Sequence, residues 1–297
     1  MSEALFITRD LVSNLIGKRV RDCHKGDFGR LLIIASSRCY CGASLLCTLA
    51  AMRSGVGLCT LASIEEAVAA ARVRAPEAIT LPLKSTKDGA ISFENFPLLL
   101  EKANSSTALL LGCGLSICED TKKLVYSLIE NVRVPIILDA DGINLVAENI
   151  DILKKASAPI VLTPHLKEMS RLTNKSVAEI KADKKGVAEA FSKQYNVNVL
   201  LKGHNTLICK RDGTLLCENK SGNTGLSKGG SGDLLSGMIA GLTPALNGNL
   251  YQAACLAAYI HGLTAELVSS RYTEYSTLPS DCADNIGYII KAINESE

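Results

Sequence analysis

Short, continuously apolar segments alternate with longer amphipathic ones along most of this 297-residue chain. The apolar segments predict strands at 30–36, 58–63, 78–83, 108–113, 135–140, 159–163 and 197–202. The amphipathic segments predict helices at about 42–54, 64–73, 119–131, 166–173 and 176–194. Strands without polar alternation that are separated by helices indicate a mostly parallel sheet, buried by helices on both faces. The pattern therefore predicts an α/β fold.

The pattern changes after residue 203. The segment "TLICKRDGTLLCE" places Asp212-Gly213 between two apolar runs, which predicts an antiparallel hairpin with a two-residue turn near the sheet edge. Three more helices are expected at about 232–242, 250–270 and 280–293. Because no repeat, low-complexity tract or Pro- or Ser-rich linker divides the chain, we predict one domain over residues 1–297.

Charge and hydropathy exclude several classes of partner. The net charge is +2, and the charges are interspersed without a basic block, so nucleic acid is not expected as a partner. No apolar run reaches the roughly 18 residues of a membrane span, and the first residues lack the apolar core of a secretory signal. The eleven cysteines form no C-x-x-C pair and mostly lie in apolar runs, which indicates reduced, buried thiols. We therefore expect a cytoplasmic protein.

Polar or glycine-rich residues follow five of the predicted strands. The segments are "SSRCYCGAS", "GCGLS", "DADGIN", "TPHLKE" and "KGHNT". Each alone is explained by the needs of a turn. Together they predict a shared cleft, because ligands of such sheets bind at the carboxyl ends of the strands.

The segment "NTGLSKGGSGDLLSGMIAGL", residues 223–242, gathers glycines around one carboxylate, Asp233. Closely spaced glycines let backbone amides approach an anion, and the following helix adds the positive end of its dipole. The spacing matches neither a Walker loop nor a dinucleotide-binding loop. A glycine turn with a helix-initiating acid is the alternative. A carboxylate beside phosphate is unfavourable unless it accepts a proton, so the segment favours a phosphate site with Asp233 as a base.

The sequence "GGSGD" followed by "LLSG", with Asn223 and Gly225 upstream, resembles the ribokinase-like enzymes. Further segments are similar, in order, to the NAD(P)H-hydrate dehydratase family. They are "KGDFGRLLIIASS", "GASLLCTLAAMRSGVGLCTLA", "LLLGCGL", "PIILDADGINLVAE", "TPHLKEMSRL" and "VLLKGHNTLI". That family uses a nucleoside phosphate to dehydrate hydrated NADH and NADPH. The resemblance implies a ribokinase-like fold and a metabolite-repair activity.

The resemblance also implies site residues. Asp233 would be catalytic and would line the hydrated-nucleotide site with Ala43, Gly114 and His165. The consumed nucleotide would be contacted by Lys202, Gly203, His204, Asn205, Thr206 and Gly232, and the anion hole would comprise Gly229, Gly230, Ser231 and Gly232. From its residues alone, His165 fits a helix cap equally well. Asp139 and Asp141 are candidates for a metal, whose ligands are left unassigned.

The resemblance implies that the substrates are NADHX and NADPHX, the hydrated forms of NADH and NADPH. It also implies Mg²⁺ and a co-substrate, ADP or ATP, of which ADP is favoured. We expect a homo-oligomer, with a tetramer as one form, and a separate epimerase, since the chain has no room for a fused one. Two departures from the family pattern concern substrate grip: Ser36 replaces a usual glycine, and "TPHLKE" lacks Pro-Gly after the histidine. A vitamin-precursor kinase of the same fold and a non-catalytic nucleotide-binding regulator are the alternatives.

Overall fold

A computed structural model describes residues 5–17, 19 and 21–295 of the chain. Its centre is one ten-stranded sheet in the order β1-β10-β9-β8-β7-β6-β5-β2-β3-β4. The strands are β1 (Leu5–Phe6), β2 (Arg30–Ile34), β3 (Leu58–Ile64), β4 (Ile79–Leu83), β5 (Ala108–Leu111), β6 (Ile136–Leu138), β7 (Ile160–Leu162), β8 (Asn198–Leu201), β9 (Thr206–Cys209) and β10 (Leu216–Asn219). Among them only β9 runs antiparallel to its neighbours. The predicted mostly parallel sheet is confirmed.

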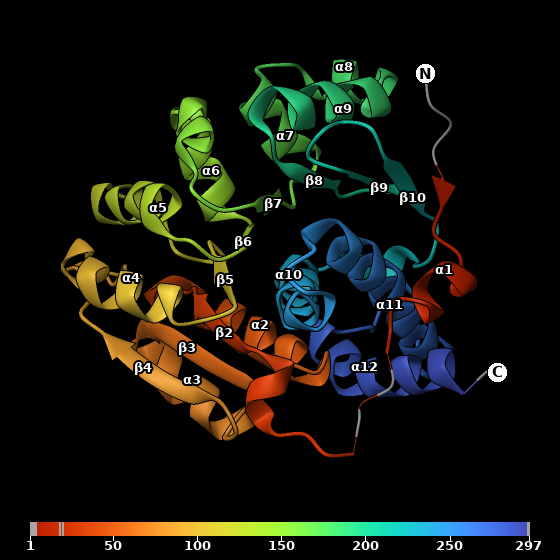
Figure 1. Cartoon of the computed structure of the whole chain (residues 1–297), viewed down its shortest axis with the longest axis horizontal. Helices are drawn as coiled ribbons and strands as arrows, with labels where there is room; N and C mark the ends of the chain where they lie inside the picture. Colours follow the sequence, from red (N-terminus) through yellow and green to blue (C-terminus); the bar gives the residue numbers. More distant parts are fainter. Residues whose placement is uncertain (1–4, 18, 20, 296–297) are drawn as a thin grey trace.

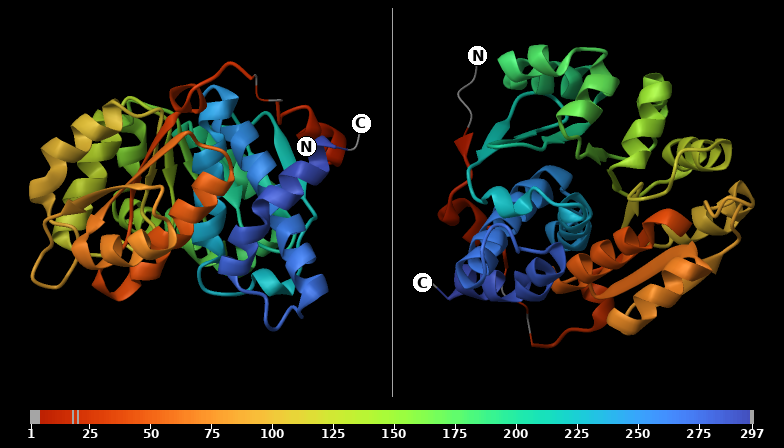
Figure 2. Two further views of the ribbon diagram at one scale, coloured as in Figure 1. Left: turned by 90° about the horizontal axis from the view of Figure 1, so that it is seen from below. Right: turned by 180° about the vertical axis from the view of Figure 1, so that it is seen from behind.

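Helices cover both faces of this curved sheet (Figure 1). The outer face carries α4 (Phe96–Asn104), α5 (Glu119–Asn131), α6 (Asp141–Glu148), α7 (Leu166–Thr173), α8 (Val177–Ala182) and α9 (Lys184–Tyr195). The inner face carries α2 (Cys41–Arg53), α10 (Ser231–Leu242), α11 (Leu250–Arg271) and α12 (Pro279–Asn294). The views of Figure 2 show the sheet enclosed between these two layers. Helix α3 (Glu65–Arg74) packs against α2 beside β3 and β4.

The two helix layers correspond to two hydrophobic clusters. Successive side chains of a strand point to opposite faces of a sheet. In β2, Leu31 and Ile33 pack in the cluster under α2, α10 and α11, whereas Leu32 and Ile34 pack in the cluster under α4 to α9. All four are at most 1% exposed. Burial on both faces explains why the strands are continuously apolar in sequence.

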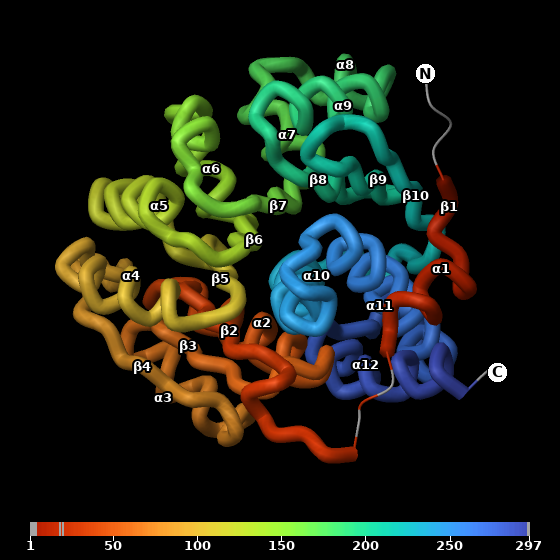
Figure 3. Tube along the Cα trace, viewed as in Figure 1, coloured from red at the N-terminus to blue at the C-terminus, as the bar shows by residue number. Residues whose placement is uncertain are grey.

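The N-terminal segment lies against the C-terminal helices. Figure 3 shows β1 and α1 (Arg9–Ser13) beside α11 and α12, and α1 contacts both helices. Strand β1 pairs with β10, so β1 forms the sheet edge and the hairpin lies one strand inside it. This edge strand was not predicted, because two exposed residues carry no periodic pattern.

Helix α10 lies unusually close to α2. A Cβ added to Gly237 would stand 2.4 Å from the backbone oxygen of Cys47, and one added to Gly241 would stand 2.4 Å from that of Ala51. The two glycines, one turn apart, therefore let the backbones of the helices touch. This contact accounts for the small residues of "LLSGMIAGL".

The predicted element boundaries need three corrections. The predicted helix 176–194 is two helices, since Asp183 interrupts it and caps α9 by accepting from the amide of Gly186 at 2.9 Å. The hairpin turn comprises residues 210–215 rather than two, because Asp212 accepts from the amide of Thr214 at 2.9 Å and widens the loop. Helices α1, α4 and α6 were missed. The sequence of α6 starts directly after a strand and was interpreted only as a polar strand ending.

Seven of the eleven cysteines are buried, as predicted: Cys47, Cys59, Cys113, Cys209, Cys217, Cys255 and Cys282. Cys23 and Cys39 are exposed instead, and both lie outside the regular sheet and its helix layers. Within the part of the chain that the structure describes, no helix combines the length and hydrophobicity that crossing a membrane requires.

We predict that Gly237→Ala lowers the free energy of unfolding by about 1–3 kcal/mol, because the added methyl group forces α10 away from α2. Gly287→Ala, in α12, is the matched control: its Cβ meets no atom within 4 Å. That change should raise the free energy of unfolding by about 0.5–1 kcal/mol. Urea unfolding of both variants measures the difference, and equal effects would contradict the close helix contact.

Candidate active site

The start of α10 presents backbone amides without protein partners. Gly230 precedes the helix with a φ of +95°, and none of the described side chains caps it. Ser231 N donates to Lys228 O at 3.2 Å, whereas the amides of Gly232 and Asp233 belong to the first turn, where an α-helix has no carbonyl to offer them. Such a helix start binds anions. The predicted anion hole, Gly229–Gly232, therefore lies at a helix start with open amides, and its anion-binding role stays a prediction.

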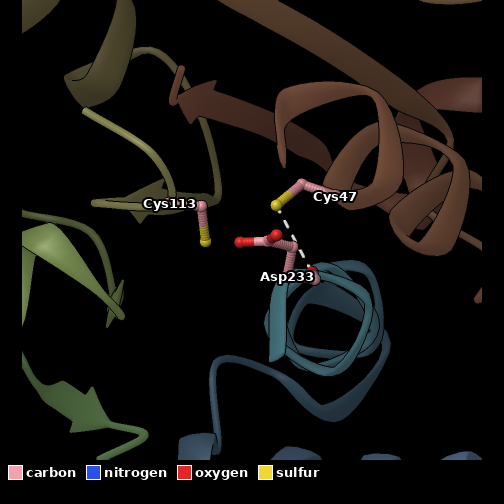
Figure 4. A group of neighbouring side chains, drawn as sticks. All are labelled: Cys47, Cys113 and Asp233. Atoms are coloured by element: carbon pink, nitrogen blue, oxygen red, sulfur yellow. Dashed lines mark hydrogen bonds between the residues drawn. The ribbon is translucent and has the colours of Figure 1, made fainter. Parts of the chain in front are cut away.

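Asp233 points from this helix start between two thiols (Figure 4). Its carboxylate, the Cys47 sulfur from α2 and the Cys113 sulfur from the loop after β5 all lie within 4.8 Å of one another. Burial, together with the charge of Asp139, raises the pKa of Asp233 to about 6. The positive end of the α10 dipole favours the ionised carboxylate, but desolvation outweighs it. A carboxylate of this kind suits a general base at neutral pH.

A buried ion pair stands next to the helix start. Asp139, 1% exposed at the end of β6, accepts from Lys202 Nζ at 2.8 Å and from Ser236 Oγ at 2.6 Å. Burial would raise the pKa of Asp139, but Lys202 and the hydrogen bonds hold it below its usual value. The pKa of Lys202 is raised: burial opposes its charge, and the charges of Asp139 and Glu168 outweigh that effect. Both groups therefore stay charged.

Lys202 also reaches the anion hole. Its Nζ lies 3.3 Å from where a Cβ on Gly232 would stand. Lys202 leaves β8 and carries its ammonium group to the first turn of α10. Its contact with the nucleotide stays a prediction. The side chain is one-fifth exposed, so it has room to meet a ligand.

His165 caps α7, which was one of the two interpretations of its sequence. Its Nδ1 accepts from the amides of Lys167 and Glu168 at 3.1 and 3.0 Å, so the imidazole is neutral in this geometry. Burial, with the nearby Lys202 charge, lowers the pKa of His165. The Nε2 atom lies 3.5 Å from Glu168 Oε1, and burial raises the pKa of Glu168 to about 7. The capping role does not exclude substrate contact, because the side chain is 49% exposed.

Ala43 and Gly114, both predicted to line the hydrated-nucleotide site, lie against each other. Gly114 has a φ of +64°, and a Cβ there would stand 3.0 Å from the Cβ of Ala43. Ser36 contacts the neighbours of both, Ser44 and Cys113, and has a φ of +73°, a backbone conformation that favours glycine. Its Oγ accepts from Ser44 N at 2.9 Å and donates to Tyr40 O at 2.7 Å. The serine therefore compensates an unfavourable backbone with hydrogen bonds.

The remaining predicted nucleotide contacts form the turn between β8 and β9. Gly203 and His204 are exposed, and Asn205 has a φ of +56°. Thr206 Oγ1 donates to Gly203 O at 3.1 Å, and Lys184 Nζ donates to His204 O at 3.2 Å. Lys202 connects this turn to the start of α10. The roles of the individual turn residues stay predictions.

The donor atoms present do not form a protein cage for Mg²⁺. Asp139 is engaged by Lys202 and Ser236, and Asp141 Oδ2 accepts from Ser116 N at 2.9 Å. Among the described residues, the one His, Cys, Asp or Glu group close enough to hold a metal ion is Cys47, Cys113 and Asp233. Sulfur ligands do not suit Mg²⁺, which in proteins usually arrives with substrate phosphates and several waters. The residues thus fit Mg²⁺ only as an ion carried by a nucleotide.

A separate cavity of about 340 Å³ lies near the amino ends of β7 and β8, lined by residues that include Pro159 and Val197. Because ligands of parallel sheets bind at the carboxyl ends, this cavity is not the candidate site.

Four residues of the site were missed from the sequence. Cys47 and Cys113 lie in apolar segments and could not be told from core residues. Ser236 was not singled out. Glu168 carried a signal, because His165 followed three residues later by Glu168 is the spacing of a capping box.

Comparison with known proteins agrees with this geometry. A model of the NAD(P)H-hydrate dehydratase family matches residues 31–287. The bifunctional NAD(P)H-hydrate repair enzyme of Thermofilum pendens is 39% identical over 248 residues, which cover 84% of this chain and 47% of that protein. The ADP-dependent (S)-NAD(P)H-hydrate dehydratase of Neisseria meningitidis serogroup B is 32% identical over 253 residues, covering 84% and 80%. The chain spans about half the length of the first bifunctional relatives it matches.

Solved structures share the whole fold. The ADP/ATP-dependent NAD(P)H-hydrate dehydratase of Bacillus subtilis, co-crystallised with ATP/Mg²⁺, superposes with a TM-score of 0.83 at 29% identity, covering 99% of this chain and 100% of that one. A ribokinase-like superfamily protein of Enterococcus faecalis gives 0.83 at 24% identity, covering 98% and 96%. The fold defines a ribokinase-like α/β protein, and the candidate site lies at the uncapped start of α10. More specifically, the chain belongs to the NAD(P)H-hydrate dehydratase family.

We predict that the free energy of unfolding of Ser36→Gly is about 1 kcal/mol higher than that of Ser36→Ala. Both changes remove the Oγ hydrogen bonds, but only glycine relieves the left-handed backbone. Chemical denaturation of the two variants measures the difference. If alanine is at least as stable as glycine, Ser36 does not hold a positive φ in solution.

Proposed function

We propose that the chain catalyses nucleotide-dependent dehydration of the S form of hydrated NADH and NADPH, restoring NADH and NADPH. The observation that carries this proposal is the position of Asp233 at an uncapped helix start, where the first amides have no protein partner. Asp233 is a half-buried residue, and its pKa is raised to about 6. The names of the relatives, a repair enzyme and a dehydratase, supply the substrate class.

Asp233 is the general base in this proposal. The hydrate carries a hydroxyl group on its reduced ring, and hydroxide is a poor leaving group at neutral pH. Asp233 accepts the hydroxyl proton while that oxygen attacks the terminal phosphoryl group of the nucleotide. A pKa near 6 lets the carboxylate be ionised before the step and accept the proton during it.

The charge that develops on the transferred phosphoryl group is stabilised by groups that are already in place. The amides of Gly232 and Asp233 would donate to the anion, and Lys202 holds its ammonium group beside Gly232, anchored by Asp139. Mg²⁺ bound to the nucleotide phosphates would neutralise further charge. The phosphorylated ring then expels phosphate, pushed by its own nitrogen, and loses a ring proton to restore the dihydropyridine.

ADP is the proposed co-substrate, with AMP and phosphate as products. The Neisseria relative is named as ADP-dependent, and the Bacillus structure as ADP/ATP-dependent with ATP/Mg²⁺ bound. Ala43, Gly114 and His165 are proposed to contact the hydrated nucleotide, and the turn from Lys202 to Thr206 the consumed one. A homo-oligomeric state, a separate epimerase partner and a cytoplasmic location stay predictions.

We predict that Asp233→Asn lowers turnover by about 10² or more while nucleotide binding is largely kept, because the change removes the base and preserves the shape. In the unsubstituted protein, kcat/KM should fall as the pH drops below about 6, since protonation of Asp233 removes the base. Steady-state kinetics between pH 5 and 8 with isothermal titration of ADP check both. Near-normal turnover in the variant would remove Asp233 from the mechanism.

We predict that ADP, NADHX and the protein yield AMP, phosphate and NADH in equal amounts, because phosphorylation serves only to create a leaving group. Cleavage of ADP without hydrate should be slow, since the site must shield its phosphoryl intermediate from water. Quantifying all three products in one reaction tests this. A stable phosphorylated alcohol would favour a small-molecule kinase, and strict dependence on ATP would change the nucleotide while keeping the dehydration.

A further inference from the structure

The group formed by Cys47, Cys113 and Asp233 has a donor set that the proposed reaction does not use. The two sulfurs and a carboxylate oxygen converge within 4.8 Å from three separate elements: α2, the loop after β5 and the start of α10. Phosphoryl transfer calls for the carboxylate alone. Two thiols that flank it, each 0% exposed, are not explained by the chemistry proposed above.

We propose that this group is a binding site for a thiophilic divalent cation of the Zn²⁺ class, with Cys47 Sγ, Cys113 Sγ and one oxygen of Asp233 as ligands. Cations of this class prefer sulfur and accept carboxylate oxygen, in tetrahedral geometry, with Zn–S distances of about 2.3 Å. Those distances place neighbouring ligand atoms about 3.8 Å apart. Ligand atoms within 4.8 Å of one another reach that spacing by small side-chain rotations.

The surroundings allow the cation to enter and to be held. Asp233 is partly exposed, so the site opens on its carboxylate side, while the sulfurs form its closed end. Three protein ligands leave a fourth position for water or a ligand hydroxyl. Cys47 Sγ donates to the backbone oxygen of Asp233 at 3.3 Å, a contact that rotation of the thiol releases.

Charge balance is favourable. As the cation binds, two thiol protons are exchanged for one M²⁺, and these protons go to solvent. The total charge of the buried group is unchanged, because two neutral thiols become two thiolates as the dication arrives.

The site has a functional consequence that rests on the proposed function. A cation held by the Asp233 carboxylate occupies the lone pair that would accept the substrate proton. Zn²⁺ or Cd²⁺ should therefore inhibit dehydration, and Mg²⁺ should not relieve the inhibition, because hard cations compete poorly for thiolates. The thiol pair therefore makes Asp233, the proposed base, selectively sensitive to soft metal ions.

Titration of the reduced, full-length protein with Cd²⁺ in the presence of Mg²⁺ tests the site directly. We expect one strongly bound Cd²⁺ per chain, with a thiolate-to-cadmium charge-transfer band in the ultraviolet. Cys47→Ala and, independently, Cys113→Ala should each weaken this binding by at least about a hundredfold, since loss of a ligand costs more than loss of a supporting contact. Circular dichroism confirms that each variant is folded.

Cys255→Ala is the matched control. Cys255 is also a buried thiol, and it forms a second thiol pair with Cys217, next to Tyr251. Among the described residues no carboxylate joins this pair in a group that could hold a metal. Its loss should leave the strong Cd²⁺ site intact. Absence of the band, or a band that survives Cys47→Ala and disappears in Cys255→Ala, would overturn the proposal. Binding at the predicted site without inhibition would establish the metal site and instead refute Asp233 as the base.

Discussion

The ion pair between Lys202 and Asp139 connects the parts of the molecule on which the site depends. Asp139 ends β6 and Lys202 leaves β8, while Ser236 of α10 donates to the same carboxylate. A buried pair of this kind stabilises little by itself, because desolvation offsets most of the attraction. Its value here is positional: it sets the distance between the strand ends and the first turn of α10. With that distance set, the ammonium group of Lys202 lies beside the open amides of Gly232 and Asp233, in the candidate site.

Asp233 reaches the candidate site because α10 lies against α2 without intervening side chains. The contacts of Gly237 with Cys47 and of Gly241 with Ala51 bring the two backbones together. Cys47, which contacts Gly237, is thereby placed beside the carboxylate of Asp233, one turn earlier in α10. A helix pair at ordinary separation would leave room for water around Asp233, and its pKa would then stay near that of a solvated aspartate. Close packing therefore sets the acidity of the proposed base.

Prediction from sequence succeeded where a residue's role follows from its local pattern. Continuous apolar runs identify strands buried on both faces, and the apolar run after Asp233 identifies helix α10. The role of the glycine cluster before Asp233 as an anion site stays a prediction. Prediction failed where the role depends on a distant partner. Nothing local to Cys47 distinguishes it from a core thiol, and the raised pKa of Asp233 arises from burial and from Asp139, far away in sequence. The short edge strand and the break at Asp183 depend on pairing and capping, which periodicity does not report.

Three residues with unfavourable backbone conformations lie at the carboxyl ends of the strands, beside the candidate site. Ser36, Ser116 and Ala140 have φ values of +73°, +64° and +53°, and they follow β2, β5 and β6, respectively. Non-glycine residues in this region cost about 1–3 kcal/mol each and persist only where their surroundings hold them. Here hydrogen bonds do so: Ser36 N donates to Cys113 O at 2.7 Å, and Ser116 N to Asp141 Oδ2 at 2.9 Å. These bonds tie the three loops to one another, so a ligand meets a rim that is already ordered. Relaxing one position, as Ser36→Gly would, should loosen its neighbours as well, because the loop that carries Cys113 and Gly114 is held by the amide of residue 36.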